Sequence, residues 1–294
     1  MRTTALVICL AAVVPMAGRA AAGPWKLASD IHLTLTQNAY SGNWVGGESG
    51  SMSWTLTSLT TAEKQVLPKV FSQNTLKLSY GITYNQDPAT DKWGSGDKST
   101  DLIDLETTYR FTLGTFVEPI VAFRGITQFL DQADPARDRW INPLDLTESA
   151  GAARVFIKDD KRQWQTRIGL AARQVIDRDA PDPLGGARRT TTEHSAGVEL
   201  VNDLVTPLSD DAILLTSKLT VFQSFFSTAK DDLLGTPGED DWKYPDINLE
   251  NIFSASITRY IEVNLYVQLL FDRQIDRGAR FKQTLSLGLA YKLI

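Results

Sequence analysis

The sequence predicts an all-β fold, a single closed antiparallel barrel of about twelve strands. Three observations support this prediction. Apolar and polar residues alternate over long stretches, most clearly in residues 261–272 and again from Phe281 to the end of the chain. The connections between these stretches are alternately short and long. Charged residues fall on the face of each stretch that lies opposite its apolar face, as expected for strands between two different environments.

The closing hairpin shows what kind of barrel this is. Residues 261–272 place Ile261, Val263 and Leu265 on one face and Glu262 and Asn264 on the other. Strands of soluble proteins usually have about five or six residues, whereas a tilted membrane strand needs about 9–11. Strand edges cannot remain unpaired in lipid, so membrane strands close into barrels with a polar interior. We therefore expect transmembrane strands, with the last strand pairing with the first.

The same alternation recurs along the whole chain. The connections near residues 112–116, 158–162, 206–210 and 258–260 are short, and those between them are longer and rich in Asp, Pro and Gly. Short periplasmic turns and longer extracellular loops are typical of outer-membrane barrels. Residues 59–69 are expected to form a short-side turn, although they are longer than the others. The expected strands are residues 25–38, 50–58, 70–86, 100–111, 117–129, 147–157, 163–176, 191–204, 212–227, 247–257, 261–272 and a last one that follows Gly278.

The N-terminus reads as a secretory signal peptide. Residues 1–22 contain Arg2, an apolar run and a small-residue cleavage site, so the barrel is expected to occupy residues 23–294 as one domain. The only cysteine, Cys9, lies in this signal. Without Arg2 and Arg19, 28 basic residues remain against 35 acidic ones, a net charge of about −7 that argues against nucleic-acid binding. We expect no cofactor and no metal site, and a soluble secreted β-protein is the alternative at this point.

Several short motifs are familiar in this order. They are Gln37 with Asn43-Trp44-x-Gly46-Gly47, then Lys98-Ser99-Thr100-Asp101, then Thr127-Gln128-Phe129, and finally Gly288-x-x-Tyr291-x-Leu293. Together they resemble an uncharacterised family of bacterial outer-membrane β-barrel proteins, a domain of unknown function, over nearly the whole mature chain. The resemblance implies location in the outer membrane of a Gram-negative bacterium and supplies no substrate or catalytic residue. The chain departs from the usual aromatic ending of such barrels by closing on Leu293-Ile294.

If the apolar face of each strand meets lipid, the charges that face the lumen can be identified by parity, that is, by whether a residue falls at the odd or the even positions of its strand. Opposite signs fall on neighbouring strands, with Asp104 and Glu106 beside Arg124, Arg167 and Arg173 beside Glu193 and Glu199, Lys218 beside Glu250, and Glu262 and Asp272 beside Lys282 and Lys292. The candidate lumen residues are Lys77, Asp104, Glu106, Arg110, Arg124, Glu148, Arg154, Arg167, Arg173, Glu193, Glu199, Lys218, Glu250, Glu262, Asp272, Lys282 and Lys292.

Two functions are compatible with such a lumen. Paired charges could form a packed salt-bridge network in a closed structural barrel, because an interior charge needs a partner where water is scarce. Alternatively, a water-filled passage could use Arg154, Arg167 and Arg173 to select small polar or anionic solutes, in a porin-like manner. About twelve strands enclose more space than the eight that side chains just fill, so a narrow passage is geometrically allowed.

A lipid hydrolase is a third, less favoured interpretation. Only two histidines exist, and His194 is adjacent to Ser195, so the two side chains point to opposite faces and cannot easily pair as base and nucleophile. His32 is expected only to hydrogen-bond within the lumen, and we expect no enzymatic activity. Acidic loops such as Asp177, Asp179 and Asp182 offer oxygen atoms to Ca²⁺ but match no defined calcium loop. Aromatic side chains near strand ends predict interfacial girdles at Trp25, Trp54, Trp164 and Tyr260.

The expected partners follow from this interpretation. They are outer-membrane lipid, the barrel-assembly machinery during biogenesis and, for a channel, a small-molecule solute. The protein is expected to be a monomer by default.

Overall fold

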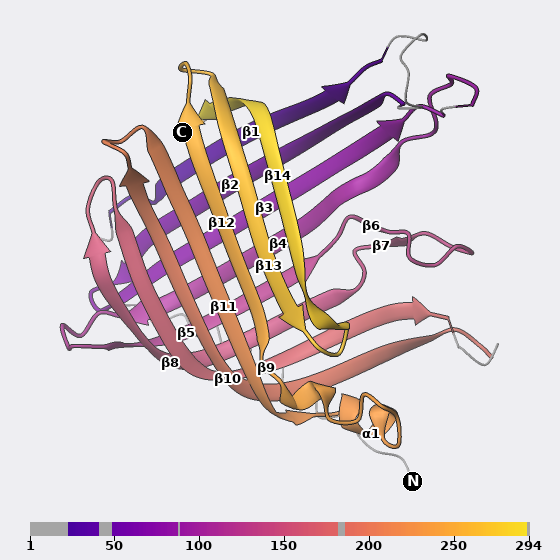
Figure 1. Ribbon diagram of the computed structural model, residues 1–294. Helices are drawn as coiled ribbons and strands as arrows, with labels where there is room; N and C mark the ends of the chain where they lie inside the picture. Colours follow the sequence, from indigo (N-terminus) through magenta and orange to yellow (C-terminus); the bar gives the residue numbers. More distant parts are fainter. Residues whose placement is uncertain (1–22, 41–48, 88, 182–185, 293–294) are drawn as a thin grey trace.

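The computed structural model describes residues 23–40, 49–87, 89–181 and 186–292. These residues form long strands that are joined at one end by tight turns and at the other mainly by long loops (Figure 1). The elements are β1 Lys26–Asn38, β2 Ser51–Leu67, β3 Val70–Asn85, β4 Asp97–Phe111, β5 Glu118–Thr127, β6 Leu130–Asp131, β7 Arg139–Trp140, β8 Leu144–Lys158, β9 Gln163–Ala180, β10 Arg189–Leu208, β11 Ile213–Ser227, α1 Ala229–Leu233, the 3-10 turn η1 Asp241–Lys243, β12 Asp246–Ser256, β13 Ile261–Asp272 and β14 Asp276–Lys292.

Twelve of these strands close into one antiparallel barrel, as the sequence predicts. Each strand pairs with its neighbour in the chain, with β8 following β5, and β14 returns to pair with β1 through Asp30↔Lys292 to Leu35↔Leu287. The expected closure of the last strand on the first is thus confirmed. The two short strands β6 and β7 form a separate hairpin inside the long loop between β5 and β8.

Two connections differ from the sequence-based expectation. The segment 59–69 is not a long turn, because β2 continues to Leu67 and only Pro68 and Lys69 separate it from β3. Consecutive positions there are polar, for example Thr60, Thr61 and Glu63, so apolar and polar residues no longer alternate in the sequence. The backbone nevertheless remains paired with β3. The loop at residues 130–146 is partly ordered as the β6–β7 hairpin.

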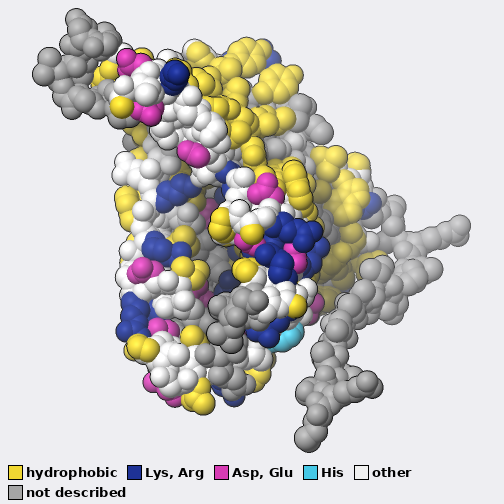
Figure 2. Space-filling view, turned by 90° about the vertical axis from the view of Figure 1, so that its right-hand side faces the viewer, with side chains coloured by type: hydrophobic (Ala, Val, Ile, Leu, Met, Phe, Trp, Pro, Cys, Tyr) yellow, Lys and Arg dark blue, Asp and Glu magenta, His cyan; other side chains and the backbone are white. Residues whose placement is uncertain are grey.

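The outer wall is apolar and the interior is polar. Ile168 and Leu170 of β9 are 52% and 64% exposed, whereas Arg167, which directly precedes Ile168 and faces inward, is only 5% exposed. The buried residues are accordingly mostly polar or charged, the reverse of a soluble β-protein. Figure 2 looks onto the loop end and shows Lys, Arg, Asp and Glu gathered there, with hydrophobic side chains along the flank.

The aromatic residues lie where a membrane interface would meet the wall. Trp25, Trp164 and Tyr260 are exposed at the turn end, and Trp54 packs against Tyr80 with ring centroids 6.2 Å apart. Within the described ranges, no helix is long and apolar enough to cross a membrane. The predicted signal peptide, the motif residues Asn43, Trp44, Gly46 and Gly47, Asp182 and the Leu293-Ile294 ending lie outside the described residues.

Candidate functional site: the charged lumen

The lumen is crossed by ion pairs that join strands on different sides of the barrel. Glu106 of β4 receives two cations, Lys218 of β11 and Arg167 of β9, and neither strand is a neighbour of β4. The Nζ of Lys218 lies 2.6 Å from Oε2 of Glu106, and Arg167 also donates to the Thr108 hydroxyl at 2.9 Å. A single carboxylate therefore ties three strands together through the interior.

A second bridge crosses the lumen between β3 and β12. Lys77 Nζ lies 3.0 Å from Oε2 of Glu250, and the Tyr266 hydroxyl donates to the same oxygen at 3.2 Å. The amide of Asn248 donates to the other oxygen at 3.1 Å. Beside this bridge, Arg124 holds Asp104 through two hydrogen bonds of 2.9 and 2.8 Å along the wall. The carboxylates of Glu250 and Asp104 are thus each held by at least two hydrogen bonds from protein groups.

Further pairs occur toward both ends. At the turn end, Lys158 of β8 reaches Glu63 of β2 at 3.1 Å, and both residues line a pocket of about 240 Å³ together with Lys26 and Val205. Toward the loop end, Arg173 of β9 contacts Asp246 of β12 at 3.1 Å as well as Asp145 of β8 at 2.7 Å. Contacts across the barrel therefore occur at several heights.

One polar contact lies at the seam where the barrel closes. His32 Nδ1 of β1 is 2.6 Å from Oε1 of Glu262 on β13, so the contact passes over β14. On β14, Gly288 is the register partner of Glu262 and of Thr34, whereas His32 is paired with Ala290, so the contact runs diagonally over the inner face of β14. A Cβ at Gly288 would lie 3.1 Å from Thr34 Cγ2 and 3.2 Å from the backbone oxygen of Leu33, so glycine allows β1 and β14 to approach closely here.

Most predicted lumen residues lie on the inner face, but their partners differ from those predicted. Of the ion pairs predicted between neighbouring strands, only the pair of Asp104 with Arg124 is present. Lys218 and Glu250 are register partners, yet each reaches a residue on another side of the barrel. Arg167 and Arg173 do not pair with Glu193 and Glu199, and Glu262 pairs with His32 rather than Lys282.

Five other candidates lie where the alternation predicted them, and the side chain of Lys292 lies outside the described part of the structure. Arg110 pairs with Glu118 at the turn end. Glu193 accepts hydrogen bonds from Ser227 and Gln274, each at 3.3 Å, near the loop end. Lys282 lies over the ring of Tyr266, with Nζ 6.0 Å from the ring centroid. The strand registers put Glu199 beside Gly169 on the inner face, and Asp272 at the loop end of β13.

Two predicted lumen residues lie on the wrong face and require correction. Glu148 is opposite Phe123, an outer-wall residue, and Arg154 shares the outer face with Ile168. The guanidinium of Arg154 lies 4.0 Å from the Phe116 ring centroid and hydrogen-bonds its backbone oxygen. The apolar signal is weak here because small residues occupy both faces of β8, so the charges alone directed the assignment inward. Arg154 therefore takes no part in a lumen filter.

The loop end carries a polar network that the sequence did not reveal as a site. Two of the familiar motifs meet in it, because Lys98 donates to Asp101 at 3.1 Å and to Gln128 at 2.9 Å. Asp101 also accepts the backbone N–H groups of Phe129 and Leu130, at 2.6 and 3.0 Å. The β5–β8 loop is thereby fastened to the end of β4.

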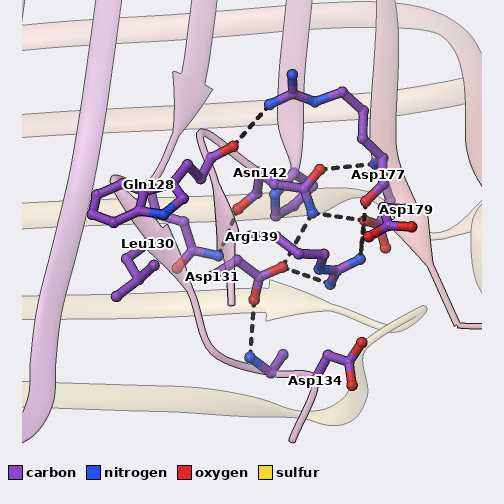
Figure 3. A network of polar contacts seen from close by, with 12 residues as sticks. Gln128, Leu130, Asp131, Asp134, Arg139, Asn142, Asp177 and Asp179 are labelled. Carbon is purple, nitrogen blue, oxygen red and sulfur yellow. Dashed lines mark hydrogen bonds and ion pairs between the residues drawn. The ribbon is translucent and has the colours of Figure 1, made fainter. Parts of the chain in front are cut away.

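The second half of this network surrounds the β6–β7 hairpin (Figure 3). Arg139 donates to Asp131 and to Asp177, both at 2.6 Å, and Asn142 donates to the same two carboxylates at 3.1 and 2.7 Å. Asp179 pairs with Arg137 at 2.9 Å. Asp177 and Asp179, two of the acidic loop residues considered as calcium ligands, are thus held by arginines. Among the described residues, no group of three or more His, Cys, Asp or Glu side chains could hold a metal ion.

The loop network should weaken in acid. Burial raises the pKa of Asp131, but hydrogen bonds from Ala133 and Asn142 and the charge of Arg139 outweigh it and bring the pKa below its usual 3.8. A lowered folded-state pKa means that this stabilisation is complete above about pH 4 and is lost as the pH falls through the folded pKa. Hydrogen exchange in residues 128–144, corrected for intrinsic rates, should show less protection at about pH 3 than at about pH 7.

Asp131→Asn provides the control for this pH effect, because the amide does not titrate. Its loop should already exchange faster at neutral pH and should lose little further protection in acid. Equal losses of protection in the wild type and in this variant would contradict the assignment to Asp131.

Comparison with known proteins adds a family of unknown function. Residues 35–132 match the family described as "Protein of unknown function (DUF3078)", a stretch that contains the motifs around Asn43, Lys98 and Thr127 but covers less than half of the chain. No curated protein matches the sequence.

Solved structures of outer-membrane barrels resemble the fold at low identity. The translocator domain of autotransporter NalP from Neisseria meningitidis is 11% identical, with 90% of this chain and 86% of that chain covered and a TM-score of 0.38. The COG4313 outer membrane channel from Pseudomonas putida F1 is 12% identical, with 90% and 94% covered and a TM-score of 0.41. The beta domain of the Bordetella autotransporter BrkA is 11% identical, with 92% and 98% covered and a TM-score of 0.33.

The barrel's own features define its environment. All twelve barrel strands are joined into a closed ring, the outward side chains are mostly apolar and the inward ones mostly polar. These are the properties that allow β-strands to span a lipid bilayer. The protein is an all-β, twelve-stranded barrel of the bacterial outer-membrane type, surrounded by lipid.

Proposed function

We propose that the protein is an outer-membrane barrel whose lumen is closed to solutes by ion pairs, so that it acts through its wall and its loop end. The observation that carries this proposal is the pair of bridges across the interior, Lys77 with Glu250 and Glu106 with Lys218 and Arg167. Each bridge joins strands that are not neighbours, so a solute moving along the barrel axis would have to separate them.

The same contacts argue against a filter for small polar or anionic solutes. Arg167 and Arg173 already bind carboxylates of the protein, and Arg154 lies on the outer wall. An arginine whose charge is neutralised by a neighbouring carboxylate attracts an anion weakly, because selectivity rings depend on net charge. The alternative is a narrow passage through the gaps between the ion pairs. Conductance measurements distinguish this passage from a closed lumen.

Planar-bilayer recording tests the proposal. Wild-type protein should show no discrete conductance steps. The double variant Lys77→Ala/Glu250→Ala removes one bridge without leaving a buried unpaired charge, and adding Lys218→Ala/Glu106→Ala/Arg167→Ala removes the other. Discrete steps should appear in the combined variant. Lys161→Ala/Asp211→Ala, an exposed pair at the turn end, should remain silent. Steady steps in folded wild-type protein would instead favour a solute channel.

The proposal includes no catalytic step. His194 uses its backbone N–H to bind the Thr228 hydroxyl at 2.9 Å, and its neighbour Glu193 faces the lumen, which supports a structural role for this segment of β10. His32 pairs with Glu262. A phospholipase assay with Ca²⁺ should therefore give the same background for wild type and His194→Ala.

The partners of this proposal are few. We propose insertion by the barrel-assembly machinery and a monomeric state, with neither a cofactor nor nucleic acid involved. Sedimentation in detergent would test the monomeric state, since a dimer would double the mass of the protein component.

A further inference from the structure

The seam between β1 and β14 is paired over only part of its length. The described register runs from Asp30↔Lys292 to Leu35↔Leu287 and stops there, whereas β14 continues to Asp276 and pairs with β13 over nearly its whole length. Within the described part of the chain, the half of β14 at residues 276–286 therefore has a strand partner on one side only. In Figure 1, β14 and β1 leave the C-terminal end in different directions.

An unpaired strand edge in a barrel wall has a physical consequence. Lipid tails offer no hydrogen-bond partners, so edge N–H and C=O groups that face hydrocarbon are strongly unfavourable. The groups along 276–286 therefore need a polar neighbour or water from the lumen. This half of the seam lies toward the loop end, so it opens sideways from the lumen into the leaflet on the loop side.

The inner face of this half strand carries two basic residues. Arg280 and Lys282 are register partners of Leu270 and Gln268, on the same face as Tyr266, whose hydroxyl binds Glu250 inside the lumen. Among the described residues, no carboxylate lies within ion-pair distance of either one, in contrast to Lys77, Arg124, Arg167, Arg173 and Lys218. The Nε of Arg280 is buried and has no hydrogen-bond partner in the described chain.

The outer face of the same half strand is strongly apolar. Phe281 is 65% exposed, Leu285 is 64% exposed and Leu287, where pairing with β1 begins, is 56% exposed. Because side chains alternate along a strand, Phe281 lies between Arg280 and Lys282 in the sequence but on the opposite side of the wall, and Leu285 and Leu287 continue its apolar face toward the paired part of the seam. The opening thus places two cations just inside an apolar, lipid-facing surface.

We propose that the open half of the β1–β14 seam binds an anionic amphiphile from the surrounding membrane. Arg280 and Lys282 hold its carboxylate or phosphate head inside the barrel edge, and its tail remains outside against Phe281, Leu285 and Leu287. The head supplies acceptors for the unpaired Arg280 Nε–H and for neighbouring backbone N–H groups, and the tail need not enter the polar lumen. This binding does not require an open lumen, so it stands apart from the conductance result.

Binding of radiolabelled palmitate to the full mature protein in detergent tests the proposal. Palmitate should bind saturably, at about one per barrel. Hexadecanol, which has the same tail and no charge, should compete at least about tenfold more weakly, a difference of about 1.4 kcal/mol. Acetate, which has the head and no tail, should not compete. Equal competition by hexadecanol would show that the site does not distinguish a charged head group from a neutral one. Competition by acetate at equal concentration would show a site for free anions. Either result overturns the proposal, as does absence of saturable binding.

Paired variants locate the site. Arg280→Gln/Lys282→Gln should weaken palmitate binding about tenfold or more, whereas Lys161→Gln/Arg162→Gln, with the same change of charge at the turn end, should bind as wild type does. Unchanged binding in the first variant would overturn the assignment to the seam. Thermal unfolding by circular dichroism confirms that each variant is folded, and if the first does not fold, the competition series with wild-type protein decides alone.

Discussion

Replacing Glu106 with alanine should lower the free energy of unfolding by about 3–5 kcal/mol, the cost of breaking a buried ion pair from one side. The carboxylate is the common partner of Lys218 and Arg167, whose side chains are 26% and 6% exposed. Without it, two cations would face each other inside the barrel with Arg124 nearby. Because their side chains are largely buried, water could not fully hydrate them in place of the lost carboxylate. Urea titration of the protein refolded in lipid vesicles measures the loss.

Two further variants separate the loss of a partner from the loss of a side chain. Asp211→Ala removes the exposed partner of Lys161, whose pair is 64% and 52% exposed, and should cost no more than about 1 kcal/mol. Converting Glu106, Arg167 and Lys218 together to methionine should recover most of the stability lost in Glu106→Ala, since no unpaired charge remains. If Glu106→Ala costs no more than Asp211→Ala, water must solvate the two cations, and the lumen is open at this height.

The barrel itself could be predicted because its signals are local. Alternation along residues 261–272 reflects two different environments on the two sides of one strand, and this requires no knowledge of neighbours. Closure follows from the physics of lipid, since a free edge on Ile31–Leu35 or on the last strand would be costly. The contrast of short and long connections then fixed which end carries the loops.

The contacts inside the lumen could not be predicted in the same way. Parity tells which side of the wall a charge faces but not how far the opposite wall lies, and that distance decides whether Lys218 meets Glu250 beside it or Glu106 across from it. Parity also failed where small residues left no apolar face, as at Glu148 and Arg154. The loop network around Asn142 depends on the approach of two separate loops, so only the density of Asp and Arg in residues 130–146 and 177–190 hinted at it.

Curvature of the wall also rests on residues that carry no charge or apolar signal. Gly151 of β8 and Gly169 of β9 are register partners on the inner face, where Figure 1 shows these strands curving around one side of the barrel. A Cβ at Gly151 would lie 2.1 Å from the backbone oxygen of Ile168, and one at Gly169 would lie 2.5 Å from that of Ala150. Glycine in a strand commonly marks a tight bend or a close approach of two backbones.

Gly169→Ala should therefore destabilise the barrel by about 3 kcal/mol, at the upper end of the range for overpacking, because the clash is with backbone that cannot rotate away. Gly125→Ala in β5 is the matched control, since its Cβ would lie 3.5 Å from Leu146 Cδ2, an ordinary contact, and should change stability little. Urea titrations of both variants in the same vesicles compare the two positions directly. Equal stability of both variants would mean that β8 and β9 separate readily, and the bend would then have to be maintained by the ion pairs that cross the lumen rather than by the glycines.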